Sequence, residues 1–330
     1  MTSFRDVNYS LRPAKAVERK MMVEAFRRLE AAWPLSEYRY VGLGSIYFAD
    51  FLLIHRLLGI SEMISLEKSI GDKVRFDFNR PYRCVEIRYG TCAELLPALP
   101  WDRRSIMWLD YDSILDTEAI ADLKSTVQNI PTGSLVIISV NVMAPEMPRD
   151  ITVMADQVAW RLNQFTGNVG AANVPHGTTG DLLRQKDLPT VCWRVLNDAV
   201  AGQVTARNGR ADLRPDTIQA QQIMHFSYSD GAPMLTVGWL IHTRADAELV
   251  QKCDFGSLPF YRPSSEPLLI QAPKLTPKEI RHLTAALPEN SPLTAETARE
   301  LMKQTGVPEH DIQKFAAVYR HYPHYAEVAL

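Results

Sequence analysis

The sequence predicts a doubly wound α/β fold in which parallel strands alternate with helices. From residue 39 onward, short apolar runs of strand type alternate with helix-like segments, and this alternation favours parallel strands joined by right-handed crossovers. The run 134–140 reads S-L-V-I-I-S-V, an almost continuous apolar stretch that is typical of a parallel strand buried on both faces. Two further β-rich runs flank Asp230-Gly231, and this turn sequence predicts an antiparallel hairpin.

The individual elements follow from the same patterns in chain order. Strands are predicted at 39–43, 63–67, 84–88, 106–110 and 135–140, and the hairpin strands at 223–229 and 234–243. Helices fit the intervals, near 46–58, 70–78, 92–97 and 116–128. Residues 38–141 and 221–245 therefore form the predicted core.

Three segments are expected to add structure around this core. Residues 1–37 are interpreted as a helical N-terminal extension, and residues 142–220 as an insertion that could form a lid over the substrate. Residues 246–330 are interpreted as a linker and a small helical appendage. Helices in these segments are expected at 13–33 and 153–165, from Thr276-Pro277, and at 294–305 and 309–321.

Composition excludes several classes of protein. The chain has 330 residues, and 36 Lys and Arg against 38 Asp and Glu give a net charge of -2, so nothing in the total charge demands a nucleic acid partner. Four scattered cysteines without a C-x-x-C pair argue against a disulfide framework or a zinc site. The N-terminus has no apolar core, and no apolar run reaches the ~18 residues of a membrane span, so we expect a cytoplasmic protein.

The most informative stretch is the glycine turn after the first predicted strand. Gly42, Gly44 and Ser45 close that strand, and Glu67 closes the next one. A glycine turn lets a ligand approach bare backbone, and an acidic residue at the next strand end can accept hydrogen bonds from both ribose hydroxyls. Tyr47 stands where a dinucleotide-binding turn usually has its third glycine, so a nucleotide-type cofactor without a pyrophosphate is favoured.

Over residues 38–245 the chain resembles class I S-adenosylmethionine-dependent methyltransferases. The matching motifs are Val41 to Ser45, Glu67, Gly90-Thr91-Cys92-Ala93, Asp110 in W-L-D-Y-D, and the approach Pro131 to Ile138. The resemblance implies S-adenosylmethionine as cofactor, with Thr91 and Cys92 facing the adenine. It also implies a seven-stranded Rossmann-like sheet of five parallel strands closed by an antiparallel hairpin, whose last strand lies beside the fifth.

A narrower resemblance connects the chain to bacterial proteins labelled O-methyltransferases. It is carried by N-Y-S-L-R-P-A-K, F-N-R-P-Y, W-L-D-Y-D and Y-S-D-G-A-P-M-L-T-V-G. The N/D-P-P-Y/F signature of amino and DNA methylation is absent after strand four, which favours an oxygen nucleophile. Asp110 and Asn141 match two positions of the metal-dependent enzymes, but Val140 stands where their second Asp would be, so no catalytic metal is expected.

The tip of the fourth strand carries the candidate catalytic residues Asp110, Tyr111 and Asp112. Asp110 could bind the methionine ammonium or orient the substrate. Asp112 could act as a general base that deprotonates a hydroxyl. The alternative is that Asp112 caps the following helix or is a solvated loop charge.

Substrate-binding candidates are Arg12, Lys15, Arg80, Tyr82 and Asn141. The basic residues could hold an anionic substrate, although basic residues on an amphipathic helix more often form its solvated face. Aromatic residues around Arg80 could stack on a base, or could equally belong to the core.

The predicted function is methyl transfer from S-adenosylmethionine to an oxygen of an unidentified acceptor. Two alternatives stay open: an inactive binding or assembly module that keeps the fold, and a nucleic-acid methyltransferase, which is compatible with the sequence but not favoured. We expect no membrane partner, and a homodimer is compatible with the sequence.

Overall fold

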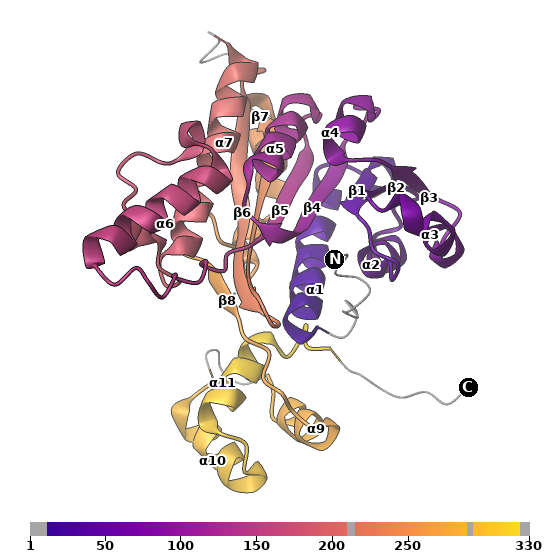
Figure 1. The fold of residues 1–330 in the computed structure, drawn as a ribbon. Helices are drawn as coiled ribbons and strands as arrows, with labels where there is room; N and C mark the ends of the chain where they lie inside the picture. Colours follow the sequence, from indigo (N-terminus) through magenta and orange to yellow (C-terminus); the bar gives the residue numbers. More distant parts are fainter. Residues whose placement is uncertain (1–11, 210–214, 289–292, 324–330) are drawn as a thin grey trace.

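The chain forms one eight-stranded sheet with helices on both faces (Figure 1). The computed structural model describes residues 12–209, 215–288 and 293–323. Parts of the predicted N-terminal extension, insertion and C-terminal appendage, namely 1–11, 210–214, 289–292 and 324–330, lie outside the described residues. The strands are β1 (Arg39–Leu43), β2 (Glu62–Glu67), β3 (Val85–Tyr89), β4 (Ser105–Ile114), β5 (Ser134–Asn141), β6 (Ile218–Ser229), β7 (Pro233–Thr243) and β8 (Leu268–Ile270).

The strand order is β3-β2-β1-β4-β5-β7-β6-β8. The first five strands are mutually parallel, and β7 pairs antiparallel with β5, with Ile138 opposite Val237. This confirms the predicted five parallel strands and the insertion of the last hairpin strand beside the fifth. The predicted number of seven strands is too low, because β8 adds a parallel strand to the edge of β6. With three residues, β8 is too short to produce a sequence period.

Two helical layers enclose the sheet, because alternate residues of each strand point to opposite faces. Trp108 and Ile137 face one hydrophobic core, and Met107 and Ile138 face the other. The first core is covered by α1 (Pro13–Arg28), α2 (Ala49–Leu58), α3 (Lys73–Asn79) and α8 (Ala247–Lys252). The second is covered by α4 (Cys92–Leu95), α5 (Thr117–Asn129), α6 (Met154–Val169) and α7 (Leu188–Asn208).

Several predicted helices are shorter in the structure than in the prediction, including the two that flank β1. The first ends at Arg28 and continues as a 3-10 turn over Leu29–Ala31. The second begins at Ala49 and not at residue 46, because Phe48 takes a left-handed φ of 44° that cannot continue a helix. Residues 44–48 therefore form a longer turn at the end of β1 than the sequence indicated.

The stretch between β5 and β6 contains a long helix that the sequence analysis did not predict. Besides α6, the 21-residue α7 packs on α5 and β6 in the second layer. Its buried residues recur at helical spacing: Leu188, Val191, Cys192, Val195, Leu196, Ala199 and Val200. The glycine-rich sequences that flank this helix obscured that period.

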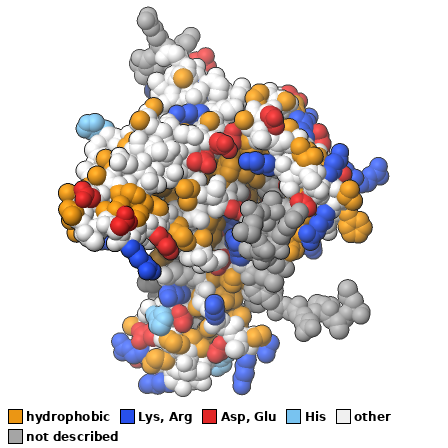
Figure 2. Space-filling model, in the orientation of Figure 1, with side chains coloured by type: hydrophobic (Ala, Val, Ile, Leu, Met, Phe, Trp, Pro, Cys, Tyr) orange, Lys and Arg blue, Asp and Glu red, His pale blue; other side chains and the backbone are white. Residues whose placement is uncertain are grey.

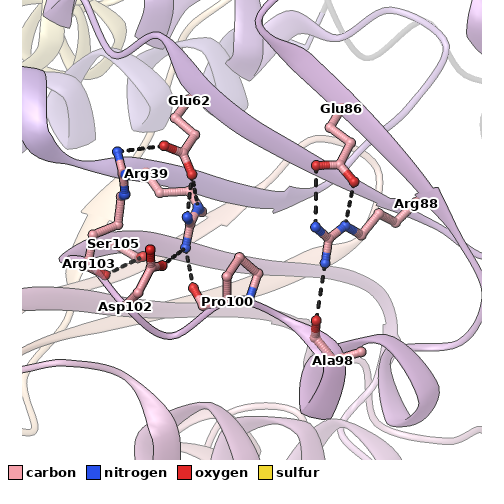
Figure 3. A network of polar contacts seen from close by, with 9 residues as sticks. All are labelled: Arg39, Glu62, Glu86, Arg88, Ala98, Pro100, Asp102, Arg103 and Ser105. Carbon is pink, nitrogen blue, oxygen red and sulfur yellow. Dashed lines mark hydrogen bonds and ion pairs between the residues drawn. The ribbon is translucent and has the colours of Figure 1, made fainter.

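The amino ends of the parallel strands are tied together by ion pairs (Figure 3). The buried Arg39 guanidinium contacts the carboxylates of Glu62 and, at 3.0 Å, Asp102. Arg103 also pairs with Glu62, at 2.5 Å. This network fixes the starts of β1, β2 and β4 and lies at the opposite end of the sheet from the glycine turn.

The C-terminal helices form a lobe below the sheet in the view of Figure 1. They are α9 (Pro277–Ala285), α10 (Ala295–Thr305) and α11 (Glu309–Val318). The predicted start of α9 is confirmed, since Thr276 and Glu279 form a reciprocal capping box. His321 anchors the lobe on α1 through Glu24, at 2.7 Å. No helix in the described part of the chain is long and apolar enough to cross a membrane.

Candidate functional site

Four predicted site residues lie at the carboxyl edge of the sheet. Gly44 follows β1, Glu67 ends β2, Asp110 lies near the end of β4, and Asn141 ends β5. The strands are parallel and adjacent in the order β2-β1-β4-β5, so their ends meet at one edge. In open α/β sheets this edge is where ligands bind.

Gly44 and Glu67 are in direct contact, and the contact requires a glycine. A Cβ atom at position 44 would lie 2.1 Å from Glu67 Oε1 and 2.1 Å from Ser65 Oγ. Ser65 Oγ donates a hydrogen bond to Glu67 Oε1 at 2.9 Å. Glu67 is only 4% exposed, and this burial raises the pKa of its carboxyl to about 8. The Glu67 carboxyl is therefore largely protonated at neutral pH.

The turn after Gly44 is held in a strained conformation. The Phe48 amide donates to the Ser45 carbonyl at 3.0 Å, and the Tyr47 amide donates to Ser45 Oγ at 3.3 Å. Phe48 has a positive φ, which is an outlier for a bulky residue, yet it is fully buried and packs edge-on against Phe51 and Phe76. Strain of this kind collects at ligand-binding turns.

Asp110 is paired with a buried lysine from the N-terminal helix. Lys15 Nζ lies 2.6 Å from Asp110 Oδ1 and 2.9 Å from Glu18 Oε2, and it donates to Tyr228 Oη at 3.1 Å. Burial by itself lowers the pKa of Lys15, but the carboxylates of Asp110 and Glu18 raise it by more, so the ammonium stays charged. Asp110 keeps 19% of its side chain exposed at the edge of the sheet.

The lysine pair continues into a polar network under the centre of the sheet. Thr236 donates to Glu18 and lies 2.7 Å from Ser139 Oγ, which accepts from Trp108 Nε1 at 2.9 Å. Burial raises the pKa of Glu18 despite the neighbouring lysine. Glu18, Ser139 and Thr236 were not among the predicted site residues. Ser139 and Thr236 are single polar residues inside the apolar runs of β5 and β7, and Glu18 is a buried acidic residue of α1.

The start of α1 is fixed at the same edge by the hairpin turn. The Asp230 carboxylate accepts from the amides of Ala14, at 3.2 Å, and Lys15, at 2.8 Å. Arg12 lies directly before this helix and is thus brought to the site edge. Lys15, in contrast, points inward with a 3% exposed side chain, and its ammonium is engaged by internal carboxylates.

Tyr111, Thr91 and Cys92 are separated from Asp110 and Lys15. Tyr111 faces the second core, where its hydroxyl donates to Asp122 Oδ2 at 2.6 Å. Cys92 lies beside this pair, and burial raises its pKa to about 11. Thr91 caps α4, with its hydroxyl accepting from the Glu94 amide at 3.3 Å.

Asp112 lies on an irregular extension of β4. The register of β4 against β5 shifts between Asp110 and Ile114, and Asp112 is exposed within this bulge. The alternative interpretation of Asp112 as a helix cap is wrong. Asp116 caps α5, and its carboxylate accepts from the Ala119 amide at 2.8 Å. Bulges of this kind often redirect a side chain next to an active site.

Tyr82 is not brought to this edge. It shortly precedes β3, which starts beside the start of β2, with Val85 opposite Met63, and it packs against His55, with 4.3 Å between ring centroids. Arg80 directly follows α3 and is exposed, and its charge is close enough to act on the hydroxyl of Tyr89, which pairs with Glu67 at the other end of β3.

A pocket of about 260 Å³ opens next to Asn141, on the side of the second core. Its walls come from the segments that follow β4 and β5 and from α6 and α7. Asn141 Oδ1 accepts from the Met143 amide at 2.8 Å, which holds the start of the segment after β5. Among the described residues, no group of three His, Cys, Asp or Glu side chains could hold a metal ion.

The solved structures that match this chain are distant in sequence. Human N-acetylserotonin methyltransferase in complex with SAM is 12% identical, with a TM-score of 0.36, and the match covers 68% of this chain and 52% of that one. An O-methyltransferase from Bacillus cereus in complex with SAH is 14% identical, with a TM-score of 0.34 and coverages of 68% and 80%. Trm1 from Pyrococcus horikoshii with S-adenosyl-L-methionine is 10% identical, with a TM-score of 0.42 and coverages of 72% and 56%.

The chain thus spans about half the length of the human enzyme. A search of curated proteins finds no relative. In contrast, the model of a family described as "Putative O-methyltransferase" matches residues 7–330. Because this match covers nearly the whole chain, the protein belongs to that O-methyltransferase family.

Proposed function

We propose that the protein transfers a methyl group from S-adenosylmethionine to an oxygen nucleophile. The observation that carries the proposal is the contact between Gly44 and Glu67 beside Asp110, at the carboxyl edge of the parallel strands. Membership in a family described by O-methylation supports both the reaction and the oxygen nucleophile.

The residues at this edge fit the cofactor. The Glu67 carboxyl has Ser65 as its hydrogen-bond donor, and the two hydroxyls of a ribose would add two donors to it. Asp110, paired with Lys15 and partly exposed at the edge, would accept from the methionine ammonium. When bound, S-adenosylmethionine supplies a methyl group on a positively charged sulfur.

The protein's part in the reaction is positioning and proton removal. Asp112, exposed on the β4 bulge, would accept the proton of the acceptor hydroxyl. The hydroxyl oxygen would then bond to the methyl carbon as the bond between that carbon and the sulfur breaks, which leaves the demethylated cofactor as a neutral thioether. The segment after β5 and helix α6 would exclude water from this side of the edge. No acidic side chain stands at position 140, so the proposed mechanism includes no metal.

Calorimetry with the purified protein tests the proposal. We expect heat of binding with S-adenosylmethionine and with its demethylated product, at an affinity in the micromolar range, roughly -8 kcal/mol. Binding of a nicotinamide dinucleotide in place of both would refute it. Cofactor binding without methyl transfer to any offered acceptor would favour an inactive binding or assembly module.

A nucleic acid acceptor is a second candidate, and one surface feature favours it. Phe78 is 87% exposed and Val74 84% exposed on α3, next to the exposed Arg75 and Arg80. Aromatic and basic side chains in this combination can bind single-stranded nucleic acid by stacking and charge. The affinity for a short RNA should then fall steeply as salt rises. A flat salt dependence would remove this candidate.

A further inference from the structure

The pocket beside Asn141 has an apolar wall and one cationic side chain, that of Arg161. Ile114, Met143 and Phe165 are among the apolar residues that line it, and Arg161 reaches it from α6. Figure 2 shows hydrophobic side chains gathered on the surface over α6, bordered by acidic and basic side chains. Met143, which lines the pocket, has 46% of its surface exposed to solvent.

Arg161 Nη1 is buried and has no hydrogen-bond partner among the described residues. A buried guanidinium N–H without an acceptor is costly, since it has lost its hydration without a replacement. Glu146 lines the same pocket but is exposed, and in the described part of the chain it forms no ion pair with Arg161. The pocket thus contains a cationic donor without an internal acceptor.

We propose that this pocket binds the methyl acceptor, and that the acceptor is a small, mainly apolar molecule with a carboxylate that pairs with Arg161. The inference rests on the proposed function. Ligand pockets usually measure roughly 300–1,000 Å³, so a pocket of about 260 Å³ suits a molecule of the size of a single substituted ring or a short acyl chain. The planar guanidinium is well matched to a carboxylate.

The position of the pocket agrees with this assignment. Ile114 lies at the end of the β4 bulge that carries Asp112, and it pairs with Asn141 at the end of β5. A molecule anchored on Arg161 would therefore extend along the ends of β4 and β5, toward Asp110 and the proposed cofactor edge. Arg161 acts as a specificity residue in this arrangement, and Asp112 keeps the proposed role of base.

Methionine-methyl NMR on the full chain, without cofactor, tests the proposal. The probes are benzoate, 4-hydroxybenzoate and octanoate, each compared with its uncharged amide. We expect the carboxylates to shift the Met143 resonance and to bind about tenfold or more tightly than the amides. The Met302 resonance, on α10, should not move.

Two variants assign the preference to Arg161. Arg161→Gln should remove the carboxylate preference, whereas Arg149→Gln, at an exposed arginine after β5, should retain it. If Arg161→Gln binds no probe at all, Arg161→Lys is the deciding variant, because it keeps the positive charge. A preference of Arg161→Lys for carboxylates over amides supports the proposal, and the loss of this preference overturns it. Equal affinity of the wild type for acids and amides, no shift of Met143, or a preference that survives Arg161→Gln would also overturn it.

Titration of the same samples with S-adenosylhomocysteine separates this inference from the proposed function. If S-adenosylhomocysteine does not bind while benzoate still shifts Met143, the methyltransferase proposal fails and the carboxylate pocket stands. If S-adenosylhomocysteine binds and no carboxylate does, the pocket assignment fails alone.

Discussion

The pKa of Glu67 leads to a pH dependence of cofactor binding that can be worked out in advance. In the ligand-free fold, burial raises this pKa from its ordinary value of 4.5 to about 8. A carboxylate that accepts from two ribose hydroxyls must be ionised, so binding should expel the proton. At pH 7 only about one carboxyl in ten is ionised, and the apparent affinity is reduced by that fraction.

The affinity for S-adenosylhomocysteine should therefore rise about tenfold, or ~1.4 kcal/mol, from pH 6 to pH 7, and level off above pH 8. Calorimetry in two buffers of different ionisation enthalpy should show release of about 0.9 proton per cofactor at pH 7. In Glu67→Gln the side chain keeps the shape of glutamate but cannot ionise. This variant should bind S-adenosylhomocysteine more weakly than the wild type and without this pH dependence. The reasoning is refuted if wild type and Glu67→Gln have the same slope, or if affinity rises as pH falls.

The same pKa shift has a consequence for the free energy of unfolding without ligand. The folded carboxyl binds its proton more tightly than the unfolded one, so its contribution to stability is complete below pH 4.5 and is lost as pH rises through 8. Wild type should therefore lose stability relative to Glu67→Gln between pH 5 and pH 8. Urea unfolding of both proteins at several pH values measures this difference.

Four further predictions follow from the site. Gly44→Ala should weaken S-adenosylhomocysteine binding at least tenfold in calorimetry, because its Cβ would lie 2.1 Å from Glu67, whereas Gly71→Ala, with nothing within 4 Å, should bind normally. Lys15→Met should destabilise the fold by about 3–5 kcal/mol in urea unfolding, since it leaves two carboxylates without their cation, and the exposed Lys303→Met should have little effect. Asp112→Ala should reduce turnover with cofactor affinity unchanged, and normal turnover would exclude it as the base. Chelator treatment should leave the rate of methyl transfer unchanged. A loss of methyl transfer on chelation that magnesium restores would contradict the metal-free mechanism.

The sequence by itself determined the parallel core and the shared edge at which its candidate cofactor residues lie. The start of β1 and its glycine turn, the acid at the end of β2 and the apolar run of β5 are local patterns. Local patterns define where a strand ends, and parallel strands bring their ends to one edge. Gly44, Glu67 and Asp110 could therefore be placed together before the structure was known.

Only the tertiary structure decided the environment of those residues. Asp110 is paired with Lys15, 95 positions earlier, and a basic residue on a helix is usually solvated. The packing of α1 across the centre of the sheet buries this lysine among carboxylates. Arg12, a basic residue directly before the same helix, is brought to the site edge because Asp230 of the hairpin turn holds the start of α1.

The same reason applies to the pocket and to the pKa of Glu67. The pocket is formed by segments after β4 and β5 together with α6 and α7, and its lining residues extend from Ile114 to Cys192 in the sequence. The raised pKa of Glu67 comes from its burial, to which the turn at Gly44, 23 positions earlier in the chain, contributes by lying against the carboxyl. Burial and charge pairing arise from contacts between residues distant in sequence, and a local period carries no record of them.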